Sequence, residues 1–230
     1  MYNYRIEYSV TGNAKYVSHL DLAQAFERSM RRASLPLAFS QGFNPHPKMS
    51  FGSALAVGLS SSGEYMDVEL TEEWSESEFK EALNRVLPEG LHIERVLLLK
   101  EKNVKLMALI NRAKYQVLIP FTGNHDIEEV VHELLARKEL PVLRRTKKGE
   151  KERDIRPGIM RLEGRVEGST VLLEMTVETG SGGNVRPEEV VQLINEVSNM
   201  SLEPEMAKYH RVGLYVQEGG QLLTPLDVGR

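Results

Sequence analysis

Apolar and polar residues alternate over positions 2–10, which predicts a strand with one buried face. After Ser18, a helix N-cap candidate, apolar residues recur at helical spacing to about Ala33 and predict a helix. The same two periods predict further elements in the first half: a short strand over 35–40, a strand-like run over 53–59, a strand over 65–70, a helix over 75–87 and a strand over 91–99. We read the order as β-α-β-β-α-β, that of a ferredoxin-like unit.

The second half repeats this element order, although no residue-level repeat joins the halves. Its predicted elements are a strand over 113–121, a helix from 126, a short strand over 142–146, a hairpin of 159–166 and 170–179, a helix near Pro187 and a closing strand over 208–216. We therefore predict an α+β fold of two tandem ferredoxin-like βαββαβ units with antiparallel sheets. The predicted domains are residues 1–102, residues 112–216 and a loose, glycine-rich tail over 217–230.

Composition narrows the classes of function that the chain can serve. The 230 residues include no cysteine, which excludes disulfides, iron–sulfur clusters and thiolate zinc sites on this chain. No apolar run approaches the roughly 18 residues of a membrane helix, so we expect no membrane partner and a cytoplasmic location. The net charge of −4 does not by itself indicate nucleic-acid binding, so the local distribution of charge decides that question.

Residues 40–52 form an unusual connector, the presenting loop, because two prolines and two glycines constrain it. Pro45 and Pro47 hold His46 in an extended frame, and such a loop is suited to presenting side chains. The alternative is a rigid turn whose histidine faces solvent. The substrate-binding candidates in this loop are Gln41, Phe43, Asn44, His46 and Lys48.

A second candidate cluster precedes and opens the first helix. It contains Lys15, Tyr16, His19 and Asp21. His19 is the candidate general acid or base, or a phosphate contact, and its alternative role is to cap or pack the helix start. We expect His19 and His46 to converge on one polar pocket, but two histidines without a third ligand make a weak zinc site, so we predict no metal and no cofactor.

Cations gather in two further places. Arg28, Arg31 and Arg32 crowd the end of the first helix, where they either contact a substrate, with Arg28 and Arg32 the candidates, or only complement the helix dipole. Residues 137–156 carry a local positive excess that is typical of a phosphate-bearing partner. The alternative is a solvated hairpin tip of mixed charge. The candidate phosphate or RNA contacts there are Arg144, Arg145, Lys147, Lys148 and Arg156.

Several of these motifs together resemble the uncharacterised radical-SAM-linked protein family. The residues that carry the resemblance are Lys15 to Asp21, the helix residues Phe26 to Arg28 and Arg31 to Ala33, Pro36, the run from Ser40 to Pro47, Gly58, Asp154 to Pro157 and Arg186 to Glu188. The resemblance implies partnership with a radical SAM protein and, through neighbouring genes, a role connected with RNA. The chain itself carries no radical SAM cysteine motif.

Two functions remain open from the sequence. The first is a non-catalytic adaptor or substrate-binding module that acts with a radical SAM enzyme on RNA or a nucleic-acid-derived substrate. The second is a metal-independent RNA-processing enzyme that uses His19, with Tyr16, Lys15 or Lys48 stabilising charge on the phosphate.

Overall fold

The computed structural model describes residues 1–100, 104–121, 126–146, 149–198 and 202–228. It is a mixed α+β structure with mostly antiparallel sheet and few helices. The chain divides into two compact units, the first made of Met1–Ile110 and Arg211–Arg230 and the second of Asn111–His210. No helix in these ranges is long and apolar enough to cross a membrane.

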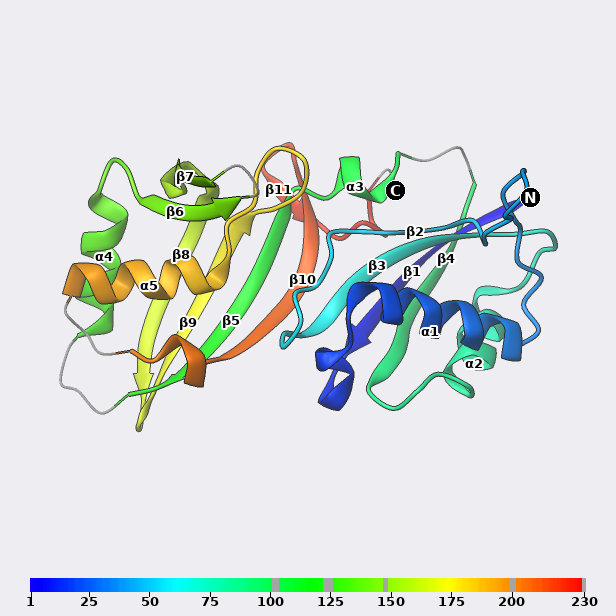
Figure 1. The fold of residues 1–230 in the computed structure, drawn as a ribbon, viewed down its shortest axis with the longest axis horizontal. Helices are drawn as coiled ribbons and strands as arrows, with labels where there is room; N and C mark the ends of the chain where they lie inside the picture. The colour runs from blue at the N-terminus through cyan, green and yellow to red at the C-terminus, as the bar shows by residue number, and fades with distance from the viewer. Residues whose placement is uncertain (101–103, 122–125, 147–148, 199–201, 229–230) are drawn as a thin grey trace. The chain divides into compact units, whose positions relative to one another are not determined.

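The first unit places helices on one face of its sheet (Figure 1). Its elements are β1 (Tyr2–Val10), α1 (His19–Arg32), β2 (Met49–Phe51), β3 (Ser60–Leu70), α2 (Glu76–Asn84), β4 (Leu91–Leu99) and α3 (Leu106–Leu109). The strand order is β4-β1-β3, and β2 pairs antiparallel with β3. Tyr4, Ile6, Phe26 and Phe79 are fully buried where α1 and α2 pack on this sheet.

The second unit contains a sheet and a separate two-stranded hairpin. Its elements are β5 (Arg112–Pro120), α4 (Ile127–Ala136), β6 (Pro141–Thr146), β7 (Gly149–Asp154), β8 (Ile159–Glu167), β9 (Thr170–Glu178) and α5 (Pro187–Ser198). Strand order in the sheet is β5-β9-β8, and β6 pairs with β7. The apolar faces of α4 and α5 are buried, with Leu134, Val190 and Ile194 fully covered.

The end of the chain differs from the predicted domain boundaries. Strand β10 (Lys208–Glu218) begins in the second unit, but from Arg211 onward the chain belongs to the first. The tail expected to be loose forms β11 (Gln221–Leu223), which pairs with β10, and Leu226 is buried. Arg5 donates a hydrogen bond to the Pro225 carbonyl, which fixes this tail on the first unit.

Two strands near the presenting loop were predicted at the wrong positions. Residues 35–40 contribute only isolated bridges, at Leu37 and Phe39, and residues 53–59 form no strand. The strand that pairs with β3 is instead β2, inside the predicted loop. Pro36 lacks a backbone N–H for a ladder, which explains why the earlier run does not continue as a strand.

Candidate functional site

The presenting loop is tied at its base by backbone hydrogen bonds. Lys48 N–H donates to the Ala38 carbonyl over 2.8 Å, and Ser40 N–H donates to the His46 carbonyl over 2.8 Å. His46 N–H returns a bond to the Ser40 hydroxyl over 3.0 Å. Lys48 also forms an ion pair with Glu69 on β3 at 2.9 Å. These bonds tie the loop at its base, between residues 38–40 and 46–48.

Phe43 stands at the tip of this tied loop with no cover. Its side chain is fully exposed, at 106% of the reference area, whereas Phe39 and Phe51 are partly buried. Gly42 beside it has φ of +126°, a conformation that L side chains rarely adopt. Gln41 and Asn44 are also exposed. An exposed aromatic ring at the tip of a loop tied at its base is available to stack on a ligand.

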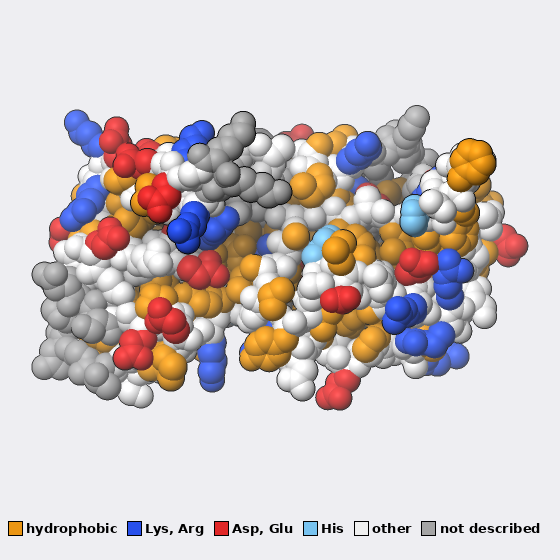
Figure 2. All heavy atoms as spheres, in the orientation of Figure 1, with side chains coloured by type: hydrophobic (Ala, Val, Ile, Leu, Met, Phe, Trp, Pro, Cys, Tyr) orange, Lys and Arg blue, Asp and Glu red, His pale blue; other side chains and the backbone are white. Residues whose placement is uncertain are grey.

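The loop lies at the C-terminal end of α1. The Arg31 guanidinium sits 5.2 Å from the centre of the Phe39 ring, and Phe39 bridges to Pro47. Arg31 also pairs with Glu27 at 2.8 Å, while Arg28 is bonded only to Gln24 among the described residues. Figure 2 shows basic side chains gathered over this part of α1.

Arg32 has a structural partner as well. Its guanidinium donates to the Val86 carbonyl over 2.7 Å and to the Ser29 hydroxyl over 3.1 Å. These bonds tie the end of α1 to the end of α2. Arg28 and Arg31 are therefore better placed than Arg32 to meet a ligand, and Arg31 was not among the residues selected from the sequence.

The second predicted cluster lies at the opposite end of α1. Ser18 caps the helix, accepting from the Asp21 N–H and donating to the Asp21 carboxylate over 2.7 Å. The His19 ring meets Phe51 edge-on at 5.2 Å and makes no hydrogen bond in the described part of the chain. Lys15 lies 4.9 Å above the Tyr16 ring, which is 62% exposed. Asp21 is thus occupied in capping, and His19 has no partner that would activate it.

His19 and His46 do not share the pocket expected from the sequence. His19 opens α1, whereas the loop that carries His46 contacts Arg31 through Phe39. A helix rises about 1.5 Å per residue, so the two ends of the 14-residue α1 lie about 20 Å apart. The loop residue whose ring meets His19 is Phe51, five residues after His46. The direction of the loop depends on the pairing of β2 with β3, which its prolines did not reveal.

The basic residues of the second unit are only partly available. Arg144 makes a bidentate ion pair with Glu189, with both distances 2.7 Å, and donates to the Asn184 carbonyl. Arg156 donates twice to the Leu135 carbonyl. Arg145 is exposed, and Lys147 and Lys148 lie outside the described residues. Arg144 and Arg156 therefore serve the fold, which the charge count alone did not reveal. No group of three potential metal ligands occurs among the described residues.

Comparison with known proteins places the chain in a family. Residues 3–187 match the family described as "Uncharacterized protein conserved in bacteria (DUF2344)", which is well over half of the 230 residues. The chain belongs to this family. The DUF2344 match covers the presenting loop, α1 and the β6–β7 hairpin, so all predicted site residues lie inside it. No match is found among curated proteins.

Solved structures show distant likenesses. The chain is similar at 12% identity and a TM-score of 0.48 to a chain of "Crystal Structure of a Cbf5-Nop10-Gar1 Complex", covering 90% of this chain and 47% of that one. It is similar at 12% identity and a TM-score of 0.45 to a chain of "Crystal structure of the archaeal box H/ACA sRNP Nop10-Cbf5 complex", covering 92% and 46%. The chain thus spans less than half the length of these two neighbours. A third likeness, to "An RAMP protein binding different RNA substrates", has 9% identity and a TM-score of 0.24, covering 95% and 100%. Likenesses at these scores do not assign a function.

Proposed function

We propose that the first unit is a non-catalytic module that binds single-stranded RNA along the exposed face of α1. The observation that carries the proposal is Phe43, fully exposed at the tip of a loop that is fixed at its base. Exposed aromatic rings stack on unpaired bases, and nearby cations neutralise the phosphates that connect those bases. Arg28, Arg31 and Lys48 supply such cations beside the loop.

The proposed path of the strand follows the outer stripe of α1. Leu20, Gln24, Arg28 and Arg31 are all exposed and recur at helical spacing. Phe43 would receive a base at one end of this stripe, and Tyr16 would receive a base at the other end. In this arrangement the two clusters predicted from the sequence serve one extended ligand rather than one pocket.

The direct test replaces Phe43. A fluorescein-labelled twelve-nucleotide oligouridylate is titrated with the whole chain, and fluorescence anisotropy measures the dissociation constant. Loss of one stacked base costs about 1–3 kcal/mol, so we expect Phe43→Ala to weaken binding by about 5–150-fold. Phe43→Tyr keeps a ring and is expected to bind like the native chain. Leu118→Ala, an exposed apolar position in the second unit, is the matched control.

Two results would contradict the proposal. One is equal affinity of Phe43→Ala and the native chain for the oligonucleotide. The other is cleavage of the RNA by the native chain that is lost in His19→Ala, which would favour the enzymatic function instead. We expect the RNA to run intact on a denaturing gel after incubation, because His19 has no hydrogen-bonded partner among the described residues.

The partnership with a radical SAM enzyme is part of the same proposal and rests on the sequence resemblance. On this view the module presents bound RNA to the enzyme encoded beside it. Purified enzyme, immobilised through a tag, should retain the chain both with and without RNA. If it retains neither form, the partnership is removed and the RNA-binding proposal is unaffected.

We also propose that each unit is a variant of the ferredoxin-like fold. In the first unit, the strand order β4-β1-β3 with β2 on β3 supports this assignment, since it is the order of a split βαβ pair. In the second unit, β5, β8 and β9 are the first, second and third strands of the predicted unit, and their order in the sheet, β5-β9-β8, matches that of the first unit. The β6–β7 hairpin is an addition to this fold, inserted between α4 and β8.

A further inference from the structure

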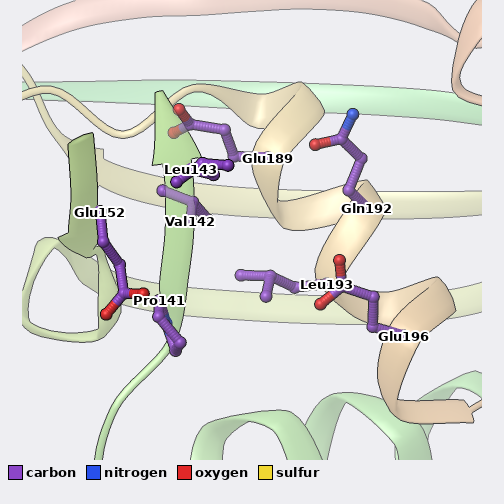
Figure 3. Close-up of a pocket in the computed structure, with 8 residues that line it drawn as sticks. All are labelled: Pro141, Val142, Leu143, Glu152, Glu189, Gln192, Leu193 and Glu196. Carbon is purple, nitrogen blue, oxygen red and sulfur yellow. The ribbon is translucent and has the colours of Figure 1, made fainter. Parts of the chain in front are cut away.

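A groove in the second unit lies between strand β6 and helix α5. Its volume is about 380 Å³. Val142, Leu143 and Leu193 give it apolar walls, and Glu152, Gln192 and Glu196 give it a polar rim. Figure 3 shows Leu193 pointing from α5 toward β6, with the Glu196 carboxylate beside it. None of these residues belongs to the proposed RNA site.

One end of the groove is held by the Arg144–Glu189 pair. Both side chains are largely buried, with side-chain exposures of 16% and 10%, and Arg144 also donates to the Asn184 carbonyl. This ion pair joins β6 to α5 and neutralises Glu189. Glu152 and Glu196 are exposed and make no ion pair in the described part of the chain, and no lysine or arginine is among the described residues that line the groove.

The strand that lines the groove has an open edge. Among the described residues, β6 pairs only with β7, so its other edge has backbone N–H and C=O groups without a strand partner. Leu143 on this strand is 65% exposed despite its large apolar side chain. Edge strands with exposed apolar side chains readily accept an added strand from another chain.

We infer that this groove binds an extended segment of a partner protein in which an apolar residue has a lysine or arginine two positions away on each side, so that all three side chains share one face. The segment would add to the open edge of β6, place its apolar side chain against Leu143 and Leu193, and direct its cations to Glu152 and Glu196. Charge complementarity selects this occupant. The same carboxylates repel phosphate, so RNA is disfavoured here, and a purely apolar segment would leave both charges without partners.

The test uses the whole chain and a synthetic peptide, fluorescein-labelled TKTLTKT with a blocked C-terminus, measured by anisotropy. Leu143 and Glu152 are direct strand partners and share one face of the hairpin, so the peptide carries its leucine and both lysines on one face. We expect saturable binding that weakens at least tenfold in Glu152→Lys/Glu196→Lys and in Leu143→Asp. The peptide TETLTET should not bind. A TKTLTKT peptide with N-methyl groups on alternate residues loses strand donors and should bind at least tenfold more weakly. Because Leu143 and both glutamates are exposed, circular dichroism of the variants should match the native chain.

The matched control separates a specific groove from general attraction between opposite charges. Glu72→Lys/Glu73→Lys makes the same change of net charge at exposed positions in the first unit and should leave peptide binding unchanged. Equal weakening by both double variants, or binding that survives Leu143→Asp, would overturn the inference. The remaining possible occupant is a second copy of this chain, which sedimentation velocity can detect. Self-association of the native chain that is abolished by Leu143→Asp would assign the groove to that second copy and would also overturn the inference.

Discussion

At the scale of single residues, Arg211 and Glu64 form the most deeply buried ion pair of the described chain. Each is 2% exposed, the guanidinium Nε lies 2.6 Å from the Glu64 carboxylate, and Arg211 also donates to the Ser53 carbonyl over 3.0 Å. Removing one partner leaves a buried charge without compensation, which costs about 3–5 kcal/mol. We expect Arg211→Ala to lower the free energy of unfolding by that amount, measured by urea denaturation.

The control for this prediction is an arginine in an exposed pair. Arg165 is bonded to Glu167 and Glu174 on the surface, where water screens the pairs, so Arg165→Ala should leave the urea midpoint close to that of the native chain. Replacing both buried partners, as Arg211→Met/Glu64→Leu, should recover most of the stability. A destabilisation of Arg211→Ala no larger than that of Arg165→Ala would show that the buried pair is not needed.

His210 gives the chain a pH-dependent contribution to stability. Burial lowers the pKa of His210 below its ordinary value of 6.5, because the charged imidazolium loses its hydration. The unfolded chain therefore takes up this proton at a higher pH than the folded chain does. The contribution is present above pH 6.5 and is lost as the pH falls toward the lowered pKa of the folded state.

We expect His210→Gln to reduce the loss of stability on acidification from about pH 6.5 to 5.5, by up to about 1.4 kcal/mol per pH unit. Urea midpoints at several pH values measure this slope. The exposed His132→Gln is the matched control and should keep the native slope. Identical slopes in all three chains would rule out His210 as the source.

Three phenylalanines show how much about a single residue can be predicted from the sequence. Phe43 and Phe51 lie in the presenting loop, and Phe39 directly precedes it. Phe51 packs on Tyr8 and Phe26, Phe39 lies beneath Arg31, and Phe43 is left in solvent. Burial depends on long-range contacts, so composition could mark the loop as unusual but could not select the exposed ring.

At the scale of elements, the RNA proposal for α1 can be tested by measuring how the affinity for RNA depends on salt concentration. Removal of one phosphate contact should reduce the slope of log affinity against log salt by about 0.7 for a single strand. We expect Arg28→Gln and Arg31→Gln each to produce this change. Arg137 pairs with Glu133 four residues earlier in α4, as Arg31 pairs with Glu27, so Arg137→Gln is the control. An unchanged slope in both α1 variants would place the phosphates elsewhere.

Strength of periodicity decided which elements could be predicted. Strands β1 and β4 were located to the residue, and α1 began at its predicted Ser18 cap, because alternation and capping are local signals. Strand β7 reads Gly-Glu-Lys-Glu-Arg-Asp and has no apolar residue to reveal it, while β2 is only three residues long. The groove beside β6 was also invisible, since Glu152 and Glu196 are far apart in the sequence and meet only through the fold.

At the scale of the whole molecule, the second unit is an insertion within the first. Residues 111–210 form the second unit, and the first unit resumes at Arg211. Arg211 forms its buried ion pair with Glu64, which lies in the earlier segment of the first unit. Ile110 and Leu214, at the two ends of this interruption, both pack beside Gly52. The two ends of the interrupted first unit are therefore close together, and domain insertion at such points is well tolerated.

This topology predicts that the first unit can be isolated only with both of its segments. A chain of residues 1–110 joined to 211–230 by a short glycine–serine linker should fold. Residues 1–110 alone leave the buried Glu64 without Arg211 and should fold poorly. That loss costs about 3–5 kcal/mol, against a typical free energy of unfolding of about 5–15 kcal/mol. Dispersed amide signals in NMR spectra distinguish the two outcomes. The linked chain should also bind oligouridylate with the affinity of the whole protein and lose that affinity in Phe43→Ala. If it folds but does not bind, RNA recognition requires the second unit, and the proposed strand path along α1 is insufficient.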